Sequence, residues 1–251
     1  MRLDKFICKS TELTRNEAKK LLKSGDVRVN GEIEKNAAMQ VHENNSITVD
    51  EQELTARTSR YFMLHKVVDS ICSNVDEVYP SVLNFLEVDK AFDLHIAGRL
   101  DADTTGLVLI TDDGRWSHNV ISPKKECQKT YRVWLRTAIS ANKAAELIEQ
   151  FKQGIQLQGE SSLTRPAVLE LVSDLSNKDS SEDPSKEPSD ATNEVLLTIT
   201  EGKYHQVKRM FAAVGNRVIG LHREQIGAIE LGDLAPGEWR SLTTKEIALF
   251  S

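Results

Sequence analysis

Apolar positions near the N-terminus follow the spacing of amphipathic helices. Leu3, Phe6 and Ile7 recur at i, i+3 and i+4, which predicts a first helix with one apolar face. Residues 14–17 then read TRNE, which is typical of a capping box, where a threonine and a glutamate satisfy backbone amides at a helix start. The pattern therefore predicts two short helices in succession.

The second helix is expected to have two different faces and to lead into a hairpin. Ala18, Leu21 and Leu22 share its apolar face, and it should end at Gly25, since glycine tolerates a left-handed backbone. Its opposite face carries Lys19, Lys20 and Lys23. Residues 27–33, VRVNGEI, then alternate around an Asn-Gly pair, a strong indication of a β-hairpin. We expect a small helix-helix-hairpin domain over residues 1–58.

The remaining residues, 59–251, alternate short strands with a few helices. The patterns predict strands over 107–110, 131–135 and 195–200, helices over 141–151 and 207–214, a turn at 234–237 and a capped final helix from 243. Strands outnumber helices without regular βαβ alternation. We therefore expect an α+β fold, with a mixed, mainly antiparallel sheet flanked by helices.

An acidic segment at residues 174–194 interrupts this larger domain. It is rich in Ser, Asp, Glu and Pro, and it contains one leucine and no aromatic residue. Such a composition cannot bury enough apolar surface to offset the entropy lost on ordering. We expect a disordered insertion between two strands.

Composition limits the class of protein. With 251 residues, 39% of them hydrophobic, the chain can form one large domain or two small ones with a sizeable core. No apolar run approaches the roughly 20 residues of a membrane span, and the charged start MRLDKFICKS is unlike a signal peptide. The three cysteines form no CxxC pair and no zinc spacing. We expect a cytoplasmic protein with reduced thiols and no membrane partner.

The net charge of −6 is unevenly distributed. The acidic segment holds seven acidic residues and two lysines, so it accounts for −5 of the total. Residues 1–35 carry nine bases and six acids, and residues 201–223 carry five bases and one acid. Local basic patches matter more than the total charge for a polyanionic partner. The net negative charge therefore does not exclude RNA as a partner.

Residues 98–114, GRLDADTTGLVLITDDG, concentrate four carboxylates beside an arginine. Asp101, Asp103 and Asp112 fit the spacing of a calcium loop, but that loop needs flanking helices and residues 107–110 favour a strand. The DxDxT pattern starting at Asp101 also matches the nucleophile loop of haloacid-dehalogenase phosphatases, which should follow an apolar strand of a doubly wound sheet. A polar turn suits residues 112–114 better than residues 98–106.

The same stretch resembles a signature of the pseudouridine synthases. GRLDADTTGL at 98–107 is similar to their GRLDxDTTGL motif, KTY at 129–131 to their second motif, and EGKYHQVKRM at 201–210 to their EGxxxQVxRM motif. Residues 1–35 resemble the S4 RNA-binding domain. The resemblance covers nearly everything except the acidic segment. It implies an S4-like domain over 1–58 and a catalytic domain over 59–251.

The resemblance implies an isomerisation and assigns residue roles. The C1′–N1 bond of a uridine breaks, the uracil turns within the site, and C5 bonds to C1′. Asp101 corresponds to the carboxylate that acts as nucleophile or base, and Lys208 to the cation that keeps it ionised, with Arg209 as the alternative. Tyr131 corresponds to the ring that stacks on the base. Arg99 corresponds to a residue that fills the place of the flipped-out uridine.

Each of these residues also has a structural interpretation. Asp103 could replace Asp101 as the reactive carboxylate, Tyr131 could belong to the core of its strand, and Lys208 could be an exposed helical lysine. Three histidines are interpreted as RNA-facing or structural: His118, His205 and His222. His65 stands where the resemblance predicts an asparagine, and it is given no role.

The expected partner is RNA. The residues expected to contact it are Arg2, Lys5, Arg15, Lys19, Lys20, Lys23, Arg28 and Arg209. On composition alone, a solvated lysine face explains the helix equally well. Residues 60–66 and 202–216 are most similar to members acting on one uridine, uridine 516, of 16S rRNA. The resemblance thus implies 16S rRNA or a partly assembled small subunit as partner, and a monomer without cofactor or metal. The alternatives are a non-catalytic RNA-binding assembly factor and the phosphatase.

Overall fold

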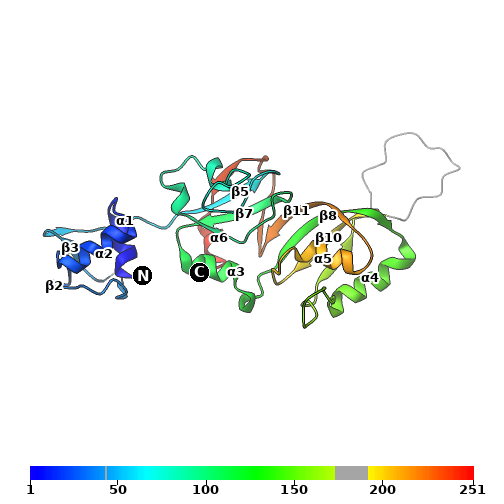
Figure 1. Cartoon of the computed structure of the whole chain (residues 1–251), viewed down its shortest axis with the longest axis horizontal. Coiled ribbons are helices and arrows are strands. Elements are labelled where there is room, and N and C mark those ends of the chain that lie inside the picture. The colour runs from blue at the N-terminus through cyan, green and yellow to red at the C-terminus, as the bar shows by residue number, and fades with distance from the viewer. Residues whose placement is uncertain (43, 173–191) are drawn as a thin grey trace. The chain divides into compact units, whose positions relative to one another are not determined.

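The computed structural model of the chain describes residues 1–42, 44–172 and 192–251. These residues form two units, Met1–Ser59 and Arg60–Ser251, whose boundary lies one residue beyond the one expected (Figure 1). Most of the expected acidic insertion, up to residue 191, lies outside the described residues. Its predicted end was wrong, because Thr192–Ile199 form one continuous strand.

The N-terminal unit packs two helices against a small sheet. Its elements are α1 (Leu3–Ser10), α2 (Arg15–Ser24), β1 (Val27–Val29), β2 (Glu32–Ile33), β3 (Ile47–Val49) and β4 (Gln52–Glu53). The strands pair antiparallel in the order β2-β1-β3-β4. Leu3, Ile7 and Leu22 are completely buried between helices and sheet, as the amphipathic spacing predicted.

Local sequence determines where these elements begin and end. The predicted capping box is present, with Thr14 accepting from the Glu17 amide and the Glu17 carboxylate accepting from the Thr14 amide. Gly25 ends α2 in the left-handed region, at φ 91°. Asn30 and Gly31 both have positive φ, which the two-residue hairpin between β1 and β2 requires. The hairpin prediction is confirmed.

The larger unit is built around one sheet. Its strands are β5 (Tyr61–Lys66), β6 (His95–Ala97), β7 (Thr105–Thr111), β8 (Lys129–Ile139), β9 (Val168–Leu171), β10 (Thr192–Ile199), β11 (Val218–Ile226), β12 (Ile229–Glu230) and β13 (Trp239–Ser241). Its helices are α3 (Gly114–Ile121), α4 (Ala141–Gln153), α5 (Gln206–Ala213) and α6 (Thr244–Ala248), with 3-10 turns η1 (Val82–Phe85), η2 (Ala91–Asp93) and η3 (Pro123–Lys125).

The strand order explains where a site can form. The sheet runs β13-β5-β7-β11-β8-β10-β9, with β6 beside β7 and β12 beside β11. Within the described ranges every pairing of this sheet is antiparallel except that of β7 with β11, which is parallel. The mainly antiparallel α+β fold is therefore confirmed. The parallel pair, called the β7–β11 seam below, lies near the middle of the sheet.

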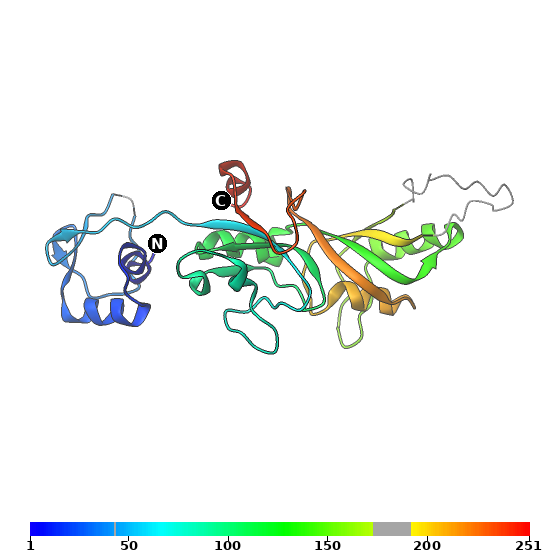
Figure 2. The same cartoon turned by 90° about the horizontal axis from the view of Figure 1, so that it is seen from above.

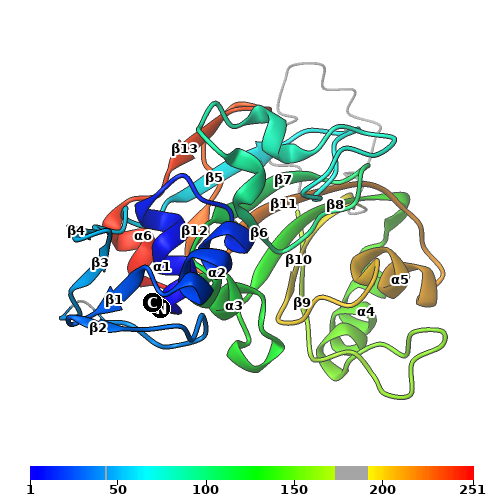
Figure 3. The same cartoon turned by 60° about the vertical axis from the view of Figure 1, so that its left-hand side comes forward.

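Helices cover both faces of the sheet. On β5, Phe62 and Leu64 belong to one apolar cluster and Met63 to another, because successive strand residues face opposite sides. Helices α4 and α5 pack on the first cluster, side by side in Figures 1 and 3, with the rings of Phe151 and Phe211 5.0 Å apart. Helices α3 and α6 complete the second cluster, and α6 (red) and α5 (gold) project to opposite sides in Figure 2.

Helix α3 corrects one local prediction. The sequence indicated a polar turn at residues 112–114, but Asp113 is the N-cap of α3 and accepts from the amides of Arg115 and Trp116. Asp112 instead binds Arg60, Oδ2 to Nε at 3.1 Å. The longest helix of the described residues, α4, has 13 residues, and none of the helices there has the length and hydropathy of a membrane span.

Candidate active site

The loop between β6 and β7 carries Asp101, and a buried lysine binds its backbone. β6 and β7 are antiparallel neighbours, so residues 98–104 reverse the chain. The Nζ of Lys66 donates to the carbonyl oxygens of Val67 (3.0 Å), Ala102 (3.2 Å) and Thr104 (2.8 Å). These bonds match the three donors of an ammonium. Lys66 is 1% exposed, and this burial lowers its pKa.

The β7–β11 seam fixes where this loop lies. Gly106 of β7 pairs with Arg223 of β11, and its φ is +108°. A Cβ at Gly106 would lie 2.2 Å from the Arg223 carbonyl oxygen. This is far inside the contact distance of two nonbonded atoms, so the two strands would have to move apart. Only glycine permits this contact, which explains the glycine in DTTGL.

Asp101 contacts two side chains from the N-terminal end of α5, its N-cap His205 and Lys208 in its first turn. Its Oδ2 lies 3.1 Å from the Nζ of Lys208, and its Oδ1 lies 3.3 Å from the Nε2 of His205. Lys208 also binds the Oδ1 of Asp103 at 2.6 Å. His205 is the N-cap of α5 with a left-handed backbone, φ 46°, a conformation that non-glycine residues adopt where surrounding structure enforces it.

The electrostatics of Lys208 follow from these contacts. Burial opposes its charge, but hydrogen bonds and charges from Asp103 and Asp101 outweigh it and raise the pKa of Lys208. Asp103 mirrors this: burial acts against its charge, yet Lys208 lowers the pKa of that carboxyl. The lysine is therefore held as a cation, and it favours the ionised form of Asp103.

Tyr131 of β8 lies beside a buried arginine. Arg223 is opposite Tyr131 in the β8–β11 pairing. Its Nε donates to the Leu107 carbonyl (2.8 Å), its Nη2 to the Gly98 carbonyl (3.2 Å) and its Nη1 to the Tyr131 hydroxyl (3.4 Å). One cation thus connects β7, the start of the Asp101 loop and the ring expected to meet the base.

Two adjoining pockets open at Asp101. The smaller has a volume of about 100 Å³ and the larger of about 730 Å³, and the larger is in the size range of small-molecule sites. Asp101, Arg99 and Tyr131 line both pockets, and Lys208 lines the smaller one. The candidate residues of the motifs therefore converge on one concave surface.

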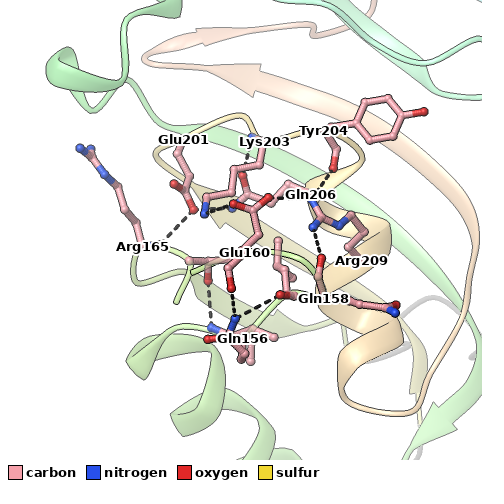
Figure 4. A network of polar contacts seen from close by, with 12 residues as sticks. Gln156, Gln158, Glu160, Arg165, Glu201, Lys203, Tyr204, Gln206 and Arg209 are labelled. Carbon is pink, nitrogen blue, oxygen red and sulfur yellow. Dashed lines mark hydrogen bonds and ion pairs between the residues drawn. The ribbon is translucent and has the colours of Figure 1, made fainter. Parts of the chain in front are cut away.

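A polar network supports the segment that carries His205 and Lys208 (Figure 4). Glu160 accepts from the Nζ of Lys203 (3.0 Å) and the Nη1 of Arg209 (3.2 Å). Arg209 donates further to the carbonyl oxygens of Gln158 (2.8 Å) and Tyr204 (3.1 Å). The cation beside Asp101 is consequently Lys208, while the guanidinium of Arg209 secures this network.

The alternatives for the carboxylate-rich stretch disagree with the fold. Residues 105–111, which a calcium loop would need as loop and helix, form strand β7, and Asp112 is engaged by Arg60. Among the described residues, no group of three or more His, Cys, Asp and Glu could hold a metal ion. The phosphatase prediction is wrong, because β6 runs antiparallel to β7 in a mainly antiparallel sheet.

Comparison with known proteins agrees with this geometry. The family model described as RNA pseudouridylate synthase matches residues 33–213, and that of the S4 domain matches residues 1–47. The chain belongs to the RNA pseudouridylate synthase family. It is 51% identical over 249 residues to the ribosomal small subunit pseudouridine synthase A of Vibrio cholerae, with 99% of this chain and 98% of that protein covered.

Two further relatives support the assignment. The protein of the same name from Escherichia coli K12 is 47% identical over 250 residues, covering 99% of both chains. A solved crystal structure of a pseudouridylate synthase superposes with a TM-score of 0.66 at 43% identity, covering 100% of both chains. The chain is thus a pseudouridine synthase with an S4 domain, as its motifs predicted.

In this pseudouridine synthase, the residues expected to contact RNA lie in different settings. The exposed ones on the N-terminal unit are Arg2, Arg15, Lys19, Lys20, Lys23 and Arg28. Arg2 pairs with Asp4 (2.8 Å), and Lys5 is half-buried.

Sequence reasoning missed two residues around the site and gave a third, His205, only a general RNA-facing or structural interpretation. In the structure Lys66 and Arg223 bind carbonyl oxygens of the loop that carries Asp101. The ring of His205 contacts the Asp101 carboxylate directly. Lys66 follows an apolar strand and Arg223 lies within one, so charged residues at inward strand positions could have indicated both. His205 had only its place inside the EGKYHQVKRM motif to suggest a role.

Proposed function

We propose that this chain converts one uridine of small-subunit ribosomal RNA to pseudouridine, with Asp101 acting directly on the target nucleotide as nucleophile or base. One observation carries this proposal: the Asp101 carboxylate contacts both Lys208 and His205, and it lines two pockets that Tyr131 also lines. The names of its relatives support the RNA class. From the resemblance of the motifs we further propose 16S rRNA, or a partly assembled small subunit, as the substrate and uridine 516 as the target.

The arrangement suits the isomerisation, in which no atoms are gained or lost overall. The C1′–N1 bond breaks, C5 bonds to C1′, and the proton leaving C5 is balanced by one gained at N1. The Nζ of Lys208 lies 3.1 Å from the Oδ2 of Asp101 and orients the carboxylate that reacts. Tyr131 offers a ring against which the uracil can stack while it turns. Arg99, exposed at the rim of both pockets, is placed to contact RNA around the flipped-out nucleotide.

Asp101→Asn tests the proposal, and Asp103→Asn is the matched control. Both remove a carboxylate that binds Lys208, but only Asp101 also touches His205. In cells that lack this protein, we expect wild type and Asp103→Asn to restore one pseudouridine in small-subunit rRNA. With purified protein, Asp101→Asn should lower the single-turnover rate by about a thousandfold or more.

Three results would contradict the proposal. If Asp101→Asn restored the modification, the reactive carboxylate would be elsewhere. If Asp103→Asn alone abolished it, Asp103 would be that carboxylate. If wild type never changed the pseudouridine pattern of the small-subunit RNA, the substrate would be another RNA, or the chain would be a binding factor on the same fold.

A further inference from the structure

Tyr204 is a large aromatic side chain held in the open next to the catalytic pocket. Its residue is 77% exposed, and it lines the larger pocket together with Asp101 and Tyr131. An isolated exposed apolar group needs no explanation, but this ring stands at the rim of a substrate site. It contributes little to a core from that position.

The ring is fixed in direction by its neighbour. Tyr204 stacks on His205, with ring centroids 3.8 Å apart and an interplanar angle of 18°. His205 in turn reaches the Oδ1 of Asp101 at 3.3 Å. One face of the tyrosine ring is therefore covered by a residue that touches the reactive carboxylate, and the high exposure leaves the other face to solvent.

The backbone beneath Tyr204 is also held in place. Its carbonyl accepts from the Nη1 of Arg209 (3.1 Å), and Arg209 is tied to Glu160 (3.2 Å). The neighbouring turn closes where the Lys203 amide donates to the Oε1 of Gln206 (2.8 Å). Figure 4 shows the Tyr204 ring directed away from this network. Little conformational entropy is lost when such a preorganised ring takes a partner.

The charge around the ring indicates what that partner is. Residues 201–223 carry five basic residues and one acidic residue, and Arg99 is exposed on the rim of the same pocket. A flat aromatic face in the same pocket as an exposed arginine suits a nucleobase, because every base offers a π-face for stacking and its phosphate can meet the positive charge of Arg99. Pocket and ring are adjacent, so the base is close to the reacting one in the RNA.

We propose that Tyr204 is the stacking platform for an RNA base directly next to the target uridine, and that His205 connects this platform to Asp101. The inference rests on the proposed function, because it needs an RNA substrate at Asp101. It assigns Tyr204 a binding role.

A double-mutant cycle tests the contact without depending on turnover. The full chain carrying Asp101→Asn is titrated with a small-subunit rRNA fragment that contains the target uridine, and the dissociation constant is measured. In this background Tyr204→Ala should weaken binding about 5- to 150-fold, the range for loss of one base–aromatic stack. Tyr204→Phe should keep the affinity within about twofold, since the ring remains.

The second arm of the cycle removes the base instead of the ring. An abasic nucleotide is placed on either side of the target uridine, one side at a time. At the contacted position the abasic change and Tyr204→Ala should each weaken binding, and together they should be no worse than one alone. The control is Phe92→Ala, an exposed aromatic residue that lines neither pocket.

The outcomes separate this inference from the proposed function. Additive effects at both neighbouring nucleotides, wild-type affinity for Tyr204→Ala, or an equal loss from Phe92→Ala would each overturn the stacking role. Any of these results can coexist with pseudouridine formation by the unmodified protein, which leaves the proposed function intact. Failure of the proposed function would show instead as no pseudouridine from wild type in any small-subunit RNA.

Discussion

Lys66 and Arg223 are buried cations that hold the backbone around Asp101. Together their donors reach the carbonyl oxygens of Val67, Gly98, Ala102, Thr104 and Leu107. Buried charges are tolerated only when they are compensated by hydrogen bonds of this kind. The two side chains therefore turn a loop of seven residues between β6 and β7 into a rigid carrier for the reactive carboxylate.

We predict that Lys66→Met lowers both stability and activity. Methionine fills a similar volume, but three carbonyl oxygens lose their donor, which should lower the free energy of unfolding by about 2 kcal/mol or more. The single-turnover rate should fall by about tenfold or more, because Asp101 loses its fixed position. Chemical denaturation and rapid-quench kinetics measure the two effects.

Lys9→Met is the matched control for this variant. Lys9 is a buried lysine of the N-terminal unit that binds the Ser59 hydroxyl (2.7 Å), so its loss leaves the Asp101 loop intact. Its single-turnover rate at saturating RNA should stay within about twofold of wild type. A wild-type rate for Lys66→Met would show that the loop keeps its geometry without the lysine.

At the scale of elements, the β7–β11 seam brings the motifs together. β7 follows the Asp101 loop, β11 supplies Arg223, and β8 on the far side of β11 supplies Tyr131. A parallel pair cannot be joined by a short hairpin, so these strands come from distant parts of the chain. The site depends on how closely the two backbones approach at Gly106.

Gly106→Ala should therefore disrupt the seam. The added Cβ would lie 2.2 Å from the Arg223 carbonyl oxygen and 2.5 Å from its amide nitrogen, and alanine disfavours the positive φ. We expect a loss of about 4 kcal/mol or more in the free energy of unfolding, which belongs to the exceptional range for single substitutions. Urea denaturation followed by circular dichroism measures it.

Gly202→Ala is the control within the same site. Gly202 lines both pockets, but a Cβ there would meet no atom within 4 Å. Its effect on the free energy of unfolding should stay within about 1 kcal/mol. Equal stability of the two variants would mean that the seam can widen to admit a methyl group.

At the scale of the whole molecule, the lysine face of α2 and the candidate catalytic residues belong to different units. The exposed face of α2 carries Lys19, Lys20 and Lys23 in the N-terminal unit, and Asp101 lies in the larger unit. Binding to the RNA backbone and rearrangement of one nucleotide can thus be tested separately. The S4 match over residues 1–47 includes this lysine face.

Replacing all three lysines by alanine should weaken binding to small-subunit RNA without changing the chemical step. Each lost phosphate contact should reduce the log–log dependence of affinity on salt by about 0.7 to 0.9 units. The single-turnover rate at saturating RNA should stay within about twofold of wild type, since Asp101 is untouched. Titrations at several salt concentrations measure the slope.

A charge-matched triple variant separates a local contact from a general loss of charge. Lys143, Lys152 and Lys245 are exposed lysines of the larger unit. Replacing them removes the same charge but should leave the slope unchanged if they lie outside the footprint. Equal slopes for wild type and the α2 variant would remove this face from the RNA contact.

Short-range features of this chain were determined by the sequence alone. The capping boxes at Thr14 and Thr243, the Asn-Gly hairpin and the buried strand at residues 107–110 appear as predicted. Each of these features depends only on residues that are close together in the sequence, so neighbouring side chains specify it. Helix α3 was missed because Asp-Gly is typical of a turn, while here the Asp113 side chain caps a helix of eight residues.

The site itself was decided by tertiary structure. The motif around Asp101 named the reactive stretch, and Lys208 was expected from a motif 107 positions away. Packing decides which strands pair across the β7–β11 seam. It therefore also decides that Arg223 and Lys66 bind the backbone of the Asp101 loop and that His205 lies against Asp101. Local periodicity reports which face of a strand is apolar, but it carries no information about which distant strand completes the sheet.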